Sequence, residues 1–258
     1  MLKKRIIPKF LLKDGRLVKG VRFHENFREA GNPVSTAKVY DSYGVDEIIF
    51  LDILASEQSR KATVDVIKKV SQEVFMPFCA GGGVSSLEDV NDFLRAGADK
   101  VSVCTAAVEN SDFIKKAAER FGDQCMVVNI DYKEVKPGIF RVFTHCGNYQ
   151  TDLEPIEFAL RMQEHNCGEI VMCSIDKDGT MSGYDIEMIQ ILSEKLEIPL
   201  IASSGAGSLQ DCVEALNAGA SAITISSMFL FTDHSPIKVR SYLASQKLNV
   251  RASKNSRN

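Results

Sequence analysis

The stretch MPFCAGGGVSSLEDVNDFLRAGADKVSV at residues 76–103 occurs a second time, as IPLIASSGAGSLQDCVEALNAGASAITI at residues 198–225. The two copies align without a gap, so that Gly83 corresponds to Gly205 and Ser86 to Ser208. Each copy reads as an apolar strand, a glycine turn, an amphipathic helix and a second apolar strand. A doubled unit of this kind closes most naturally into a barrel made of two similar halves.

The rest of the chain continues the same alternation of strands and helices. Short runs rich in Val and Ile predict eight strands, at 5–11, 47–52, 77–80, 100–103, 126–131, 169–174, 199–203 and 222–226. Helical patterns lie near 33–43, 60–74, 86–96, 112–121, 155–165, 186–196, 208–218 and 237–246. The sequence therefore predicts an α/β protein, a single (βα)8 TIM barrel with a two-fold half-barrel repeat over residues 1–251, followed by a polar C-terminal tail at 252–258.

Composition narrows the class of function. The formal net charge of −3 argues against nucleic acid as a partner, and no apolar run is long enough to span a membrane. Seven cysteines occur without a CxxC pair or a Cys/His cluster, which predicts reduced thiols and a cytoplasmic location. We expect neither a metal nor a cofactor.

Glycine and small hydroxyl residues gather where five of the predicted strands end. These positions are Gly81–Gly83, Cys104–Thr105, Asp178–Thr180, Ser203–Gly205 and Ser226–Ser227. Glycine lets a backbone approach an anion, and the N–H groups of a following helix can bind it. Because the unit is repeated, we expect two phosphate sites on opposite sides of the barrel mouth, in preference to glycines that serve only as tight turns.

One acidic residue stands at the end of the predicted fifth strand. Asp131 follows an apolar run and could act as a general acid or base, although an aspartate there can also merely cap the next turn. The matching position at the end of the first strand is Leu11, so the chain offers only one carboxylate where two would indicate catalysis.

Four charged residues stand where predicted strands begin, namely Arg5, Glu47, Lys100 and Glu169. They could form a ring of mixed charge across the barrel floor, or they could be four solvated residues on its rim. From the residues alone we favour solvated charges, because charged side chains are usually exposed.

Six segments together resemble the cyclase subunit of imidazole glycerol phosphate synthase, and the resemblance extends to about Arg251. They are KDGRLVKG (13–20), DEIIFLDI (46–53), GGGV (81–84), GADKVSVCTAAVEN (97–110), SIDKDGTMSGYD (174–185) and IASSGAGS (201–208). The resemblance implies a (βα)8 barrel that docks a glutaminase on its floor, receives ammonia through the barrel and closes an imidazole ring, a lyase activity of histidine biosynthesis.

Transferred residue by residue, the resemblance assigns roles to most of these positions. It implies an ammonia gate at Arg5, Glu47, Lys100 and Glu169, and a glutaminase interface at Asp99 and Gln124. It implies a catalytic acid at Asp131. The remaining matches would bind substrate: Lys19, Gly83, Thr105, Asp178, Gly179, Thr180, Gly205, Ser226 and Ser227.

The mouth departs from the family pattern at four positions. Leu11 replaces an aspartate, Cys104 an asparagine, Cys146 a serine and Ser204 a glycine. Leucine cannot transfer a proton, so a barrel that keeps the gate but loses this acid looks more like an ammonia conduit than a cyclase. The stretch KRIIPKFLLK (4–13), which carries this leucine, is similar to that of paralogues associated with sugar amidation in surface-polysaccharide synthesis. We therefore favour a subunit that passes ammonia from a glutaminase to a separate amidating enzyme. The alternatives are a working histidine-pathway cyclase and a non-catalytic activator or scaffold for the glutaminase.

Overall fold

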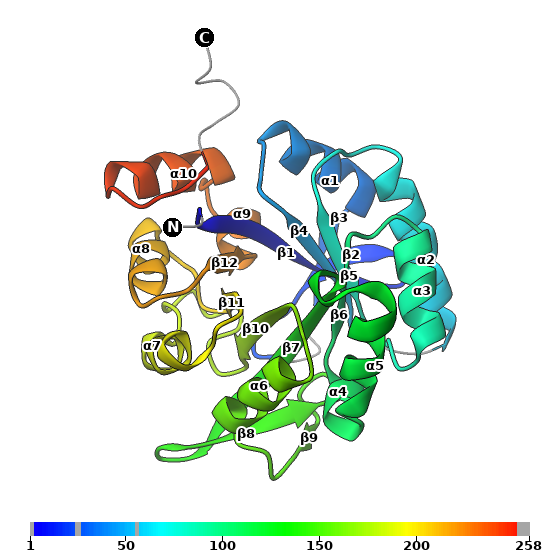
Figure 1. Ribbon diagram of the computed structural model, residues 1–258. Helices are drawn as coiled ribbons and strands as arrows, with labels where there is room; N and C mark the ends of the chain where they lie inside the picture. The colour runs from blue at the N-terminus through cyan, green and yellow to red at the C-terminus, as the bar shows by residue number, and fades with distance from the viewer. Residues whose placement is uncertain (1–2, 24–26, 55–56, 252–258) are drawn as a thin grey trace.

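The computed structural model describes residues 3–23, 27–54 and 57–251, and for residues 57–62 it describes the backbone only. Within these residues, parallel strands form a closed eight-stranded barrel with helices between them, which confirms the predicted single (βα)8 TIM barrel (Figure 1). The predicted tail at 252–258 lies outside the described residues.

The eight barrel strands follow the predicted ranges closely. They are β1 (Arg5–Lys13), β4 (Ile48–Asp52), β5 (Phe78–Gly81), β6 (Lys100–Val103), β7 (Met126–Lys136), β10 (Glu169–Ser174), β11 (Leu200–Ser203) and β12 (Ala222–Ile225). They are neighbours in that order, and β12 pairs with β1 to close the barrel. Most of their residues are buried, because the barrel interior and the surrounding helices cover the two faces.

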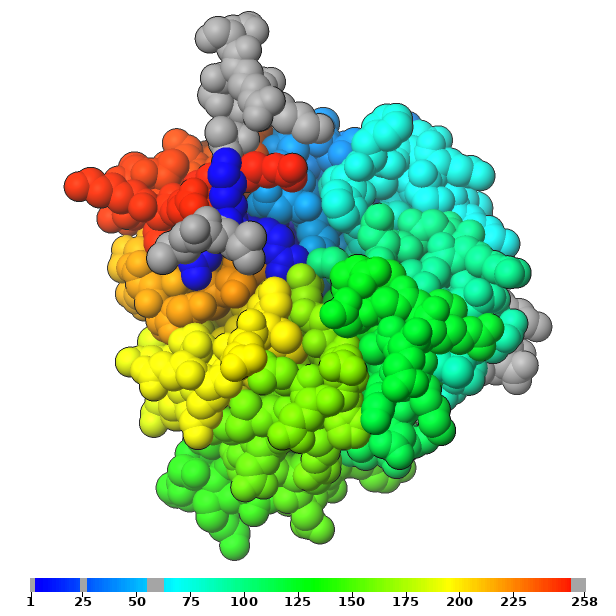
Figure 2. All heavy atoms as spheres, viewed as in Figure 1, coloured from blue at the N-terminus to red at the C-terminus, as the bar shows by residue number. Residues whose placement is uncertain are grey.

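Helices surround the strands. They are α1 (Pro33–Ser42), α2 (Glu57–Ser71), α3 (Leu87–Arg95), α5 (Asp112–Phe121), α6 (Pro155–Glu164), α7 (Ile186–Lys195), α8 (Leu209–Asn217) and α10 (Pro236–Ser245), all within a few residues of the predicted ranges. Two short helices, α4 (Thr105–Glu109) and α9 (Ser227–Phe231), and a 3₁₀ turn at Asp123–Cys125 add to the prediction. The first described residues, in blue, lie beside the last ones, in red (Figure 2). Lys4 N there donates to Asn249 O at 2.8 Å.

The sequence repeat is visible in the backbone. Ser86 and Ser208 both form capping boxes, at the starts of α3 and α8. At the ends of these helices, Ser71 Oγ donates to Ala96 O at 3.0 Å and Ser193 Oγ to Ala218 O at 2.9 Å. These pairs of residues keep the same spacing of 122 residues, so the two halves repeat in their supporting contacts as well as in their strands.

Two long connections leave the barrel at its mouth. After β1 the chain forms an antiparallel extension with β2 (Arg16–Lys19) and β3 (Arg28–Gly31), and β7 continues into β8 (Ile139–Thr144) and β9 (Tyr149–Gln150). The strands β2, β3, β8 and β9 are additional to the eight barrel strands that the sequence predicts. The extensions occupy matching places in the two halves, beside Leu11 in one and Asp131 in the other.

Alternate residues of the barrel strands point inward and form layers. A compact apolar cluster inside the barrel contains Ile7, Ile49, Cys79, Val127, Val171, Ile201 and Ala222, with Leu51 packed against it. The larger cluster lies between the barrel and its helices. The small inner cluster therefore separates the charged floor from the polar mouth.

Candidate functional site

The four charged residues at strand starts form a closed ring on the barrel floor, which we call the floor ring (Arg5, Glu47, Lys100 and Glu169). Arg5 contacts Glu47 at 2.8 Å and Glu169 at 2.9 Å. Lys100 contacts the same two carboxylates at 2.8 and 2.9 Å. Each cation is thus shared by both anions, and the ring carries no net charge.

Our reading of these four residues from their sequence alone, as solvated rim charges, is wrong. Glu47 is buried, and the other three side chains are mostly shielded from solvent. Burial lowers the pKa of Lys100, but the Glu47 and Glu169 carboxylates outweigh that effect and the net pKa is raised. Closure of the barrel brings together residues that lie up to 164 positions apart in the chain. Local sequence patterns cannot predict contacts between residues so far apart.

The two residues expected at the glutaminase interface lie at the same end of the barrel. Asp99 directly precedes β6 and accepts a hydrogen bond from Phe78 N at 2.9 Å through Oδ2, while Gln124 lies in the turn before β7. Both are exposed. Asp99 directly precedes Lys100 in the chain, and β7, which follows Gln124, pairs with β6, so both residues are available on the outer face of the floor.

At the mouth, strand register makes Leu11 the structural counterpart of Asp131. Leu11 pairs with Leu51 and Asp131 pairs with Cys173, and Leu51 and Cys173 are themselves separated by the 122 residues of the repeat. Asp131 is buried and accepts from Asn129 Nδ2 at 2.7 Å. Burial raises the pKa of Asp131, against the opposing effects of Lys9 and Asn129.

Lys9 was missed by the sequence analysis. It lies in β1 one inward position below Leu11, is buried, and donates to Ser203 Oγ at 2.8 Å and to Cys173 Sγ at 3.3 Å. Its position in the inward series that begins with Arg5 and Ile7 was the signal that could have identified it. Burial lowers the pKa of Lys9, but Cys173, Asp178 and Asp131 together raise it above its usual value.

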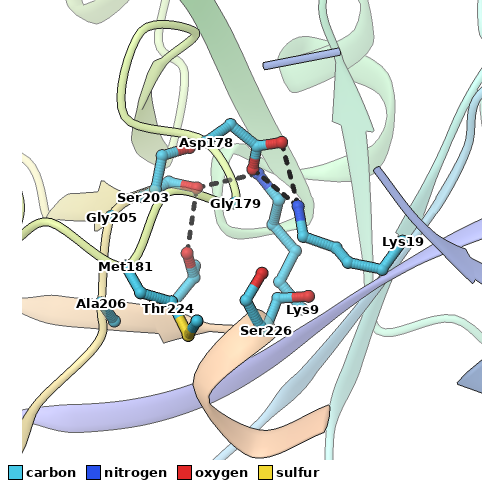
Figure 3. Close-up of a pocket in the computed structure, with 12 residues that line it drawn as sticks. Lys9, Lys19, Asp178, Gly179, Met181, Ser203, Gly205, Ala206, Thr224 and Ser226 are labelled. Atoms are coloured by element: carbon cyan, nitrogen blue, oxygen red, sulfur yellow. Dashed lines mark hydrogen bonds and ion pairs between the residues drawn. The ribbon is translucent and has the colours of Figure 1, made fainter. Parts of the chain in front are cut away.

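A small cavity at the mouth contains several of the predicted substrate-binding residues. Lys19 Nζ contacts both carboxylate oxygens of Asp178, at 2.8 and 2.9 Å, and both side chains are buried. The cavity is lined in addition by Lys9, Gly179, Gly205, Ser226 and Ser227, and Figure 3 shows the amino groups of Lys9 and Lys19 meeting beside Asp178. Ser226 Oγ is buried without a hydrogen-bond partner among the described residues.

The other predicted phosphate residues do not line this cavity. Gly83 and Thr105 lie at the ends of β5 and β6, and Thr105 Oγ1 accepts from His145 N at 3.0 Å. Thr180 is adjacent to the cavity but donates to Lys177 O at 2.8 Å. Thr105 nevertheless repeats Ser227, because Cys104 and Ser226 precede matching short helices with nearly the same backbone angles.

The three other positions at which the sequence analysis expects a departure from the family pattern, Cys104, Cys146 and Ser204, also lie at the mouth. Cys104 Sγ donates to Asp131 Oδ2 at 3.5 Å, and Cys146 Sγ donates to Ile53 O at 3.1 Å. Ser204 has φ +80°, a backbone region that favours glycine, and its Oγ lies 3.2 Å from Cys173 Sγ. Cys104 therefore places a thiol against the Asp131 carboxylate, whereas Ser204 places a hydroxyl beside Cys173.

Residues 5–235 match the family model described as histidine biosynthesis protein. The chain belongs to this family. The match covers all eight barrel strands, and with them both the floor ring and the mouth.

Among the described residues, no group of three or more His, Cys, Asp and Glu side chains is arranged to hold a metal ion. In the same part of the chain, no helix has the length and apolar character that crossing a membrane requires.

Proposed function

We propose that this chain is the barrel subunit of a glutamine amidotransferase complex. A glutaminase docks on the floor near Asp99 and Gln124, and its ammonia enters the barrel through the floor ring. The nitrogen then passes to a separate enzyme that amidates a nucleotide sugar for surface-polysaccharide synthesis. The observation that carries this proposal is the contrast between the two ends of the barrel. The floor keeps a ring of two cations and two anions in contact, while the mouth has Leu11 as the counterpart of Asp131.

The floor ring suits the passage of ammonia. Two cations and two anions that contact one another offset the cost of placing charge in a barrel interior, where an unpaired charge is strongly destabilising. Directly above the ring lies the apolar inner cluster. Neutral ammonia crosses an apolar layer far more easily than ammonium, which would lose its hydration.

The mouth supports ammonia transfer better than ring closure. A general acid or base contributes typically about 10²–10⁴-fold to a rate, and leucine at position 11 cannot supply it. The register that makes Leu11 the counterpart of Asp131 leaves a carboxylate at one of these two matching positions and a leucine at the other. One carboxylate cannot readily serve both ends of a cyclisation.

A working cyclase in histidine biosynthesis is the second candidate. The family match and the buried Lys19–Asp178 pair beside Gly179, Gly205 and Ser227 favour it, since these residues belong to a site that would hold a phosphorylated ligand. In that reading another group compensates for Leu11. A glutaminase activator without channel or catalysis is the third candidate.

The decisive experiment uses the complex of this chain with its glutaminase and the amidating enzyme. The change is Lys100→Ala, and the measurement is acceptor amidated per glutamine hydrolysed. We expect the ratio to fall while amidation supported by added ammonium stays unchanged, because the substitution opens the floor ring but leaves the acceptor enzyme intact. Lys38→Ala is the matched control, since Lys38 in α1 forms an exposed ion pair with Glu73 in the turn after α2.

Two results would contradict the channel. One is a coupling ratio for Lys100→Ala equal to that of Lys38→Ala. The other is failure of any glutaminase to bind the floor. A glutaminase that is stimulated by this chain, with no dependence of coupling on Lys100, would instead support the activator.

A further inference from the structure

Lys9 and Asn129 face one another across the barrel interior. Their strands, β1 and β7, are four places apart in either direction around the eight-stranded barrel. Lys9 pairs with Ile49 and Asn129 with Val171, and these partners are separated by the 122 residues of the repeat. The two residues are therefore counterparts at one level, above the apolar inner cluster and below Leu11 and Asp131.

The Lys9 ammonium is held in place but not fully satisfied. Its side chain is 7% exposed, and its hydrogen bonds within the described residues go to Ser203 Oγ and Cys173 Sγ. An ammonium has three N–H donors, so one donor remains. Thr224 Oγ1 in turn donates to Ser203 Oγ at 2.9 Å, which fixes the hydroxyl that anchors Lys9.

Asn129 presents the complementary group. It is 6% exposed, and its Nδ2 donates to Asp131 Oδ1 at 2.7 Å. An ionised carboxylate only accepts hydrogen bonds, so this contact turns the amide oxygen away from Asp131. Asn129 Oδ1 is buried and has no hydrogen-bond partner among the described residues. A buried carbonyl oxygen left without a donor is costly, so a small hydrogen-bond donor such as a ligand or a water molecule would be stabilised there.

These groups match the hydrogen-bonding pattern of ammonia. Ammonia accepts through one lone pair and donates through three N–H groups, and the interior here offers one N–H from Lys9 and acceptors at Asn129 Oδ1 and the neighbouring Asp131 carboxylate. Asp131 links the two sides, because it bonds Asn129 and lies close enough to Lys9 to affect its charge. Resting on the proposed function, we propose that Lys9, Asn129 and Asp131 form a holding site for one molecule of neutral ammonia between the floor ring and the mouth.

The same site discriminates against ammonium ion. Ammonium has no lone pair to accept the remaining Lys9 N–H, and a fixed positive charge repels it in a medium of low dielectric constant. The charged and titratable groups that face Lys9 are Asp131, Asp178 and Cys173, and Asp178 is already paired with Lys19. Lys9 can therefore donate a hydrogen bond to neutral ammonia, while its positive charge repels ammonium that enters from the mouth.

The test uses the chain alone, so that it does not depend on a glutaminase. The side-chain amide signal of Asn129 is followed by NMR during titration with ammonium chloride, at a pH above the pKa of ammonium and again well below it. Sodium chloride at the same concentration is the control for ionic strength. We expect the signal to shift and saturate with the concentration of neutral ammonia at the higher pH, and to stay in place at the lower pH.

Two variants sharpen the result. Lys9→Met should weaken the response to ammonia about tenfold or more, as expected for loss of a hydrogen bond from a charged donor, and should allow a response to ammonium. Lys13→Met, on the same strand beyond the barrel interior, should behave as the unchanged chain. The wild-type titration decides the question by itself if Lys9→Met does not fold.

The outcomes separate this inference from the proposed function. No shift of the Asn129 signal at either pH, or equal shifts at both, would overturn the holding site even if glutamine-dependent amidation is confirmed. A saturable shift with neutral ammonia alone supports the site, and it does so even if no glutaminase binds the floor.

Discussion

Replacing Lys100 by methionine tests whether the floor ring is a buried electrostatic unit. Methionine keeps an unbranched apolar chain but removes two contacts, at 2.8 Å to Glu47 and 2.9 Å to Glu169. The ring then holds two carboxylates and only Arg5. Breaking a fully buried ion pair costs about 3–5 kcal/mol. Because Lys100 and Glu169 retain 16% and 11% side-chain exposure and Arg5 still contacts both anions, we expect a loss of about 2–3 kcal/mol in unfolding free energy.

The assay is urea unfolding followed by circular dichroism, with Lys38→Met as the reference. Lys38 contacts Glu73 at the same 2.8 Å, but the side chains are 56% and 45% exposed, so its loss should cost less than about 1 kcal/mol. Adding Glu47→Gln to Lys100→Met returns the ring to zero net charge and should recover about 1 kcal/mol. If Lys100→Met and Lys38→Met agree within about 0.5 kcal/mol, the ring behaves as surface charge and the reasoning is refuted.

Three further predictions concern the mouth. With ammonium and the cyclase substrate, the turnover number of the unchanged chain should lie far below the usual enzyme range of about 1–10³ s⁻¹. Leu11→Asp should raise any residual rate if Asp131 can still transfer a proton. A turnover number of the unchanged chain within the usual range would favour the working cyclase. Calorimetry should detect binding of inorganic phosphate or a doubly phosphorylated compound near Gly205, and no heat at millimolar concentration would leave the glycines as turn residues only. Gly205→Ala should lower the free energy of unfolding by about 3 kcal/mol or more, because the φ of Gly205 is +102° and an added Cβ would overlap the carbonyl oxygen of Gly183. Gly138→Ala is the control, since open space surrounds Gly138, and it should cost about 1 kcal/mol in the same urea unfolding assay.

The barrel architecture was predictable because the residues that start and end its helices are close together in the sequence and occur in both copies of the repeat. Ser86 and Ser208 precede amphipathic helices, and Gly97 and Gly219 follow them with positive φ, so the sequence marks both helix starts and helix ends twice. The short helices α4 and α9 were not predicted, since five residues are too few to show a helical period.

The site was only partly predictable, because closure decides which residues meet. Glu47 and Glu169 look like ordinary strand-start charges until the barrel places them on the same two cations. In the sequence, Lys9 only interrupts an apolar run, because no neighbouring residue indicates that Ser203 and Cys173 will accept hydrogen bonds from its ammonium group. Leu11 was matched to Asp131 from its place at a strand end, and the strand register agrees with that match.

The pairing of β1 with β12 has a consequence for the order in which the molecule assembles. Synthesis delivers Arg5, Glu47 and Lys100 in the first half, which alone carries two cations for one anion, and the second anion, Glu169, comes later. Arg5 reaches its strand partner Ala222 only when nearly the whole chain exists. Pairings so distant in sequence form slowly, and the charges stay hydrated until they do. Neutralisation of the ring therefore coincides with closure, so that a chain truncated before β10 (Glu169–Ser174) keeps an uncompensated positive charge at its open edge.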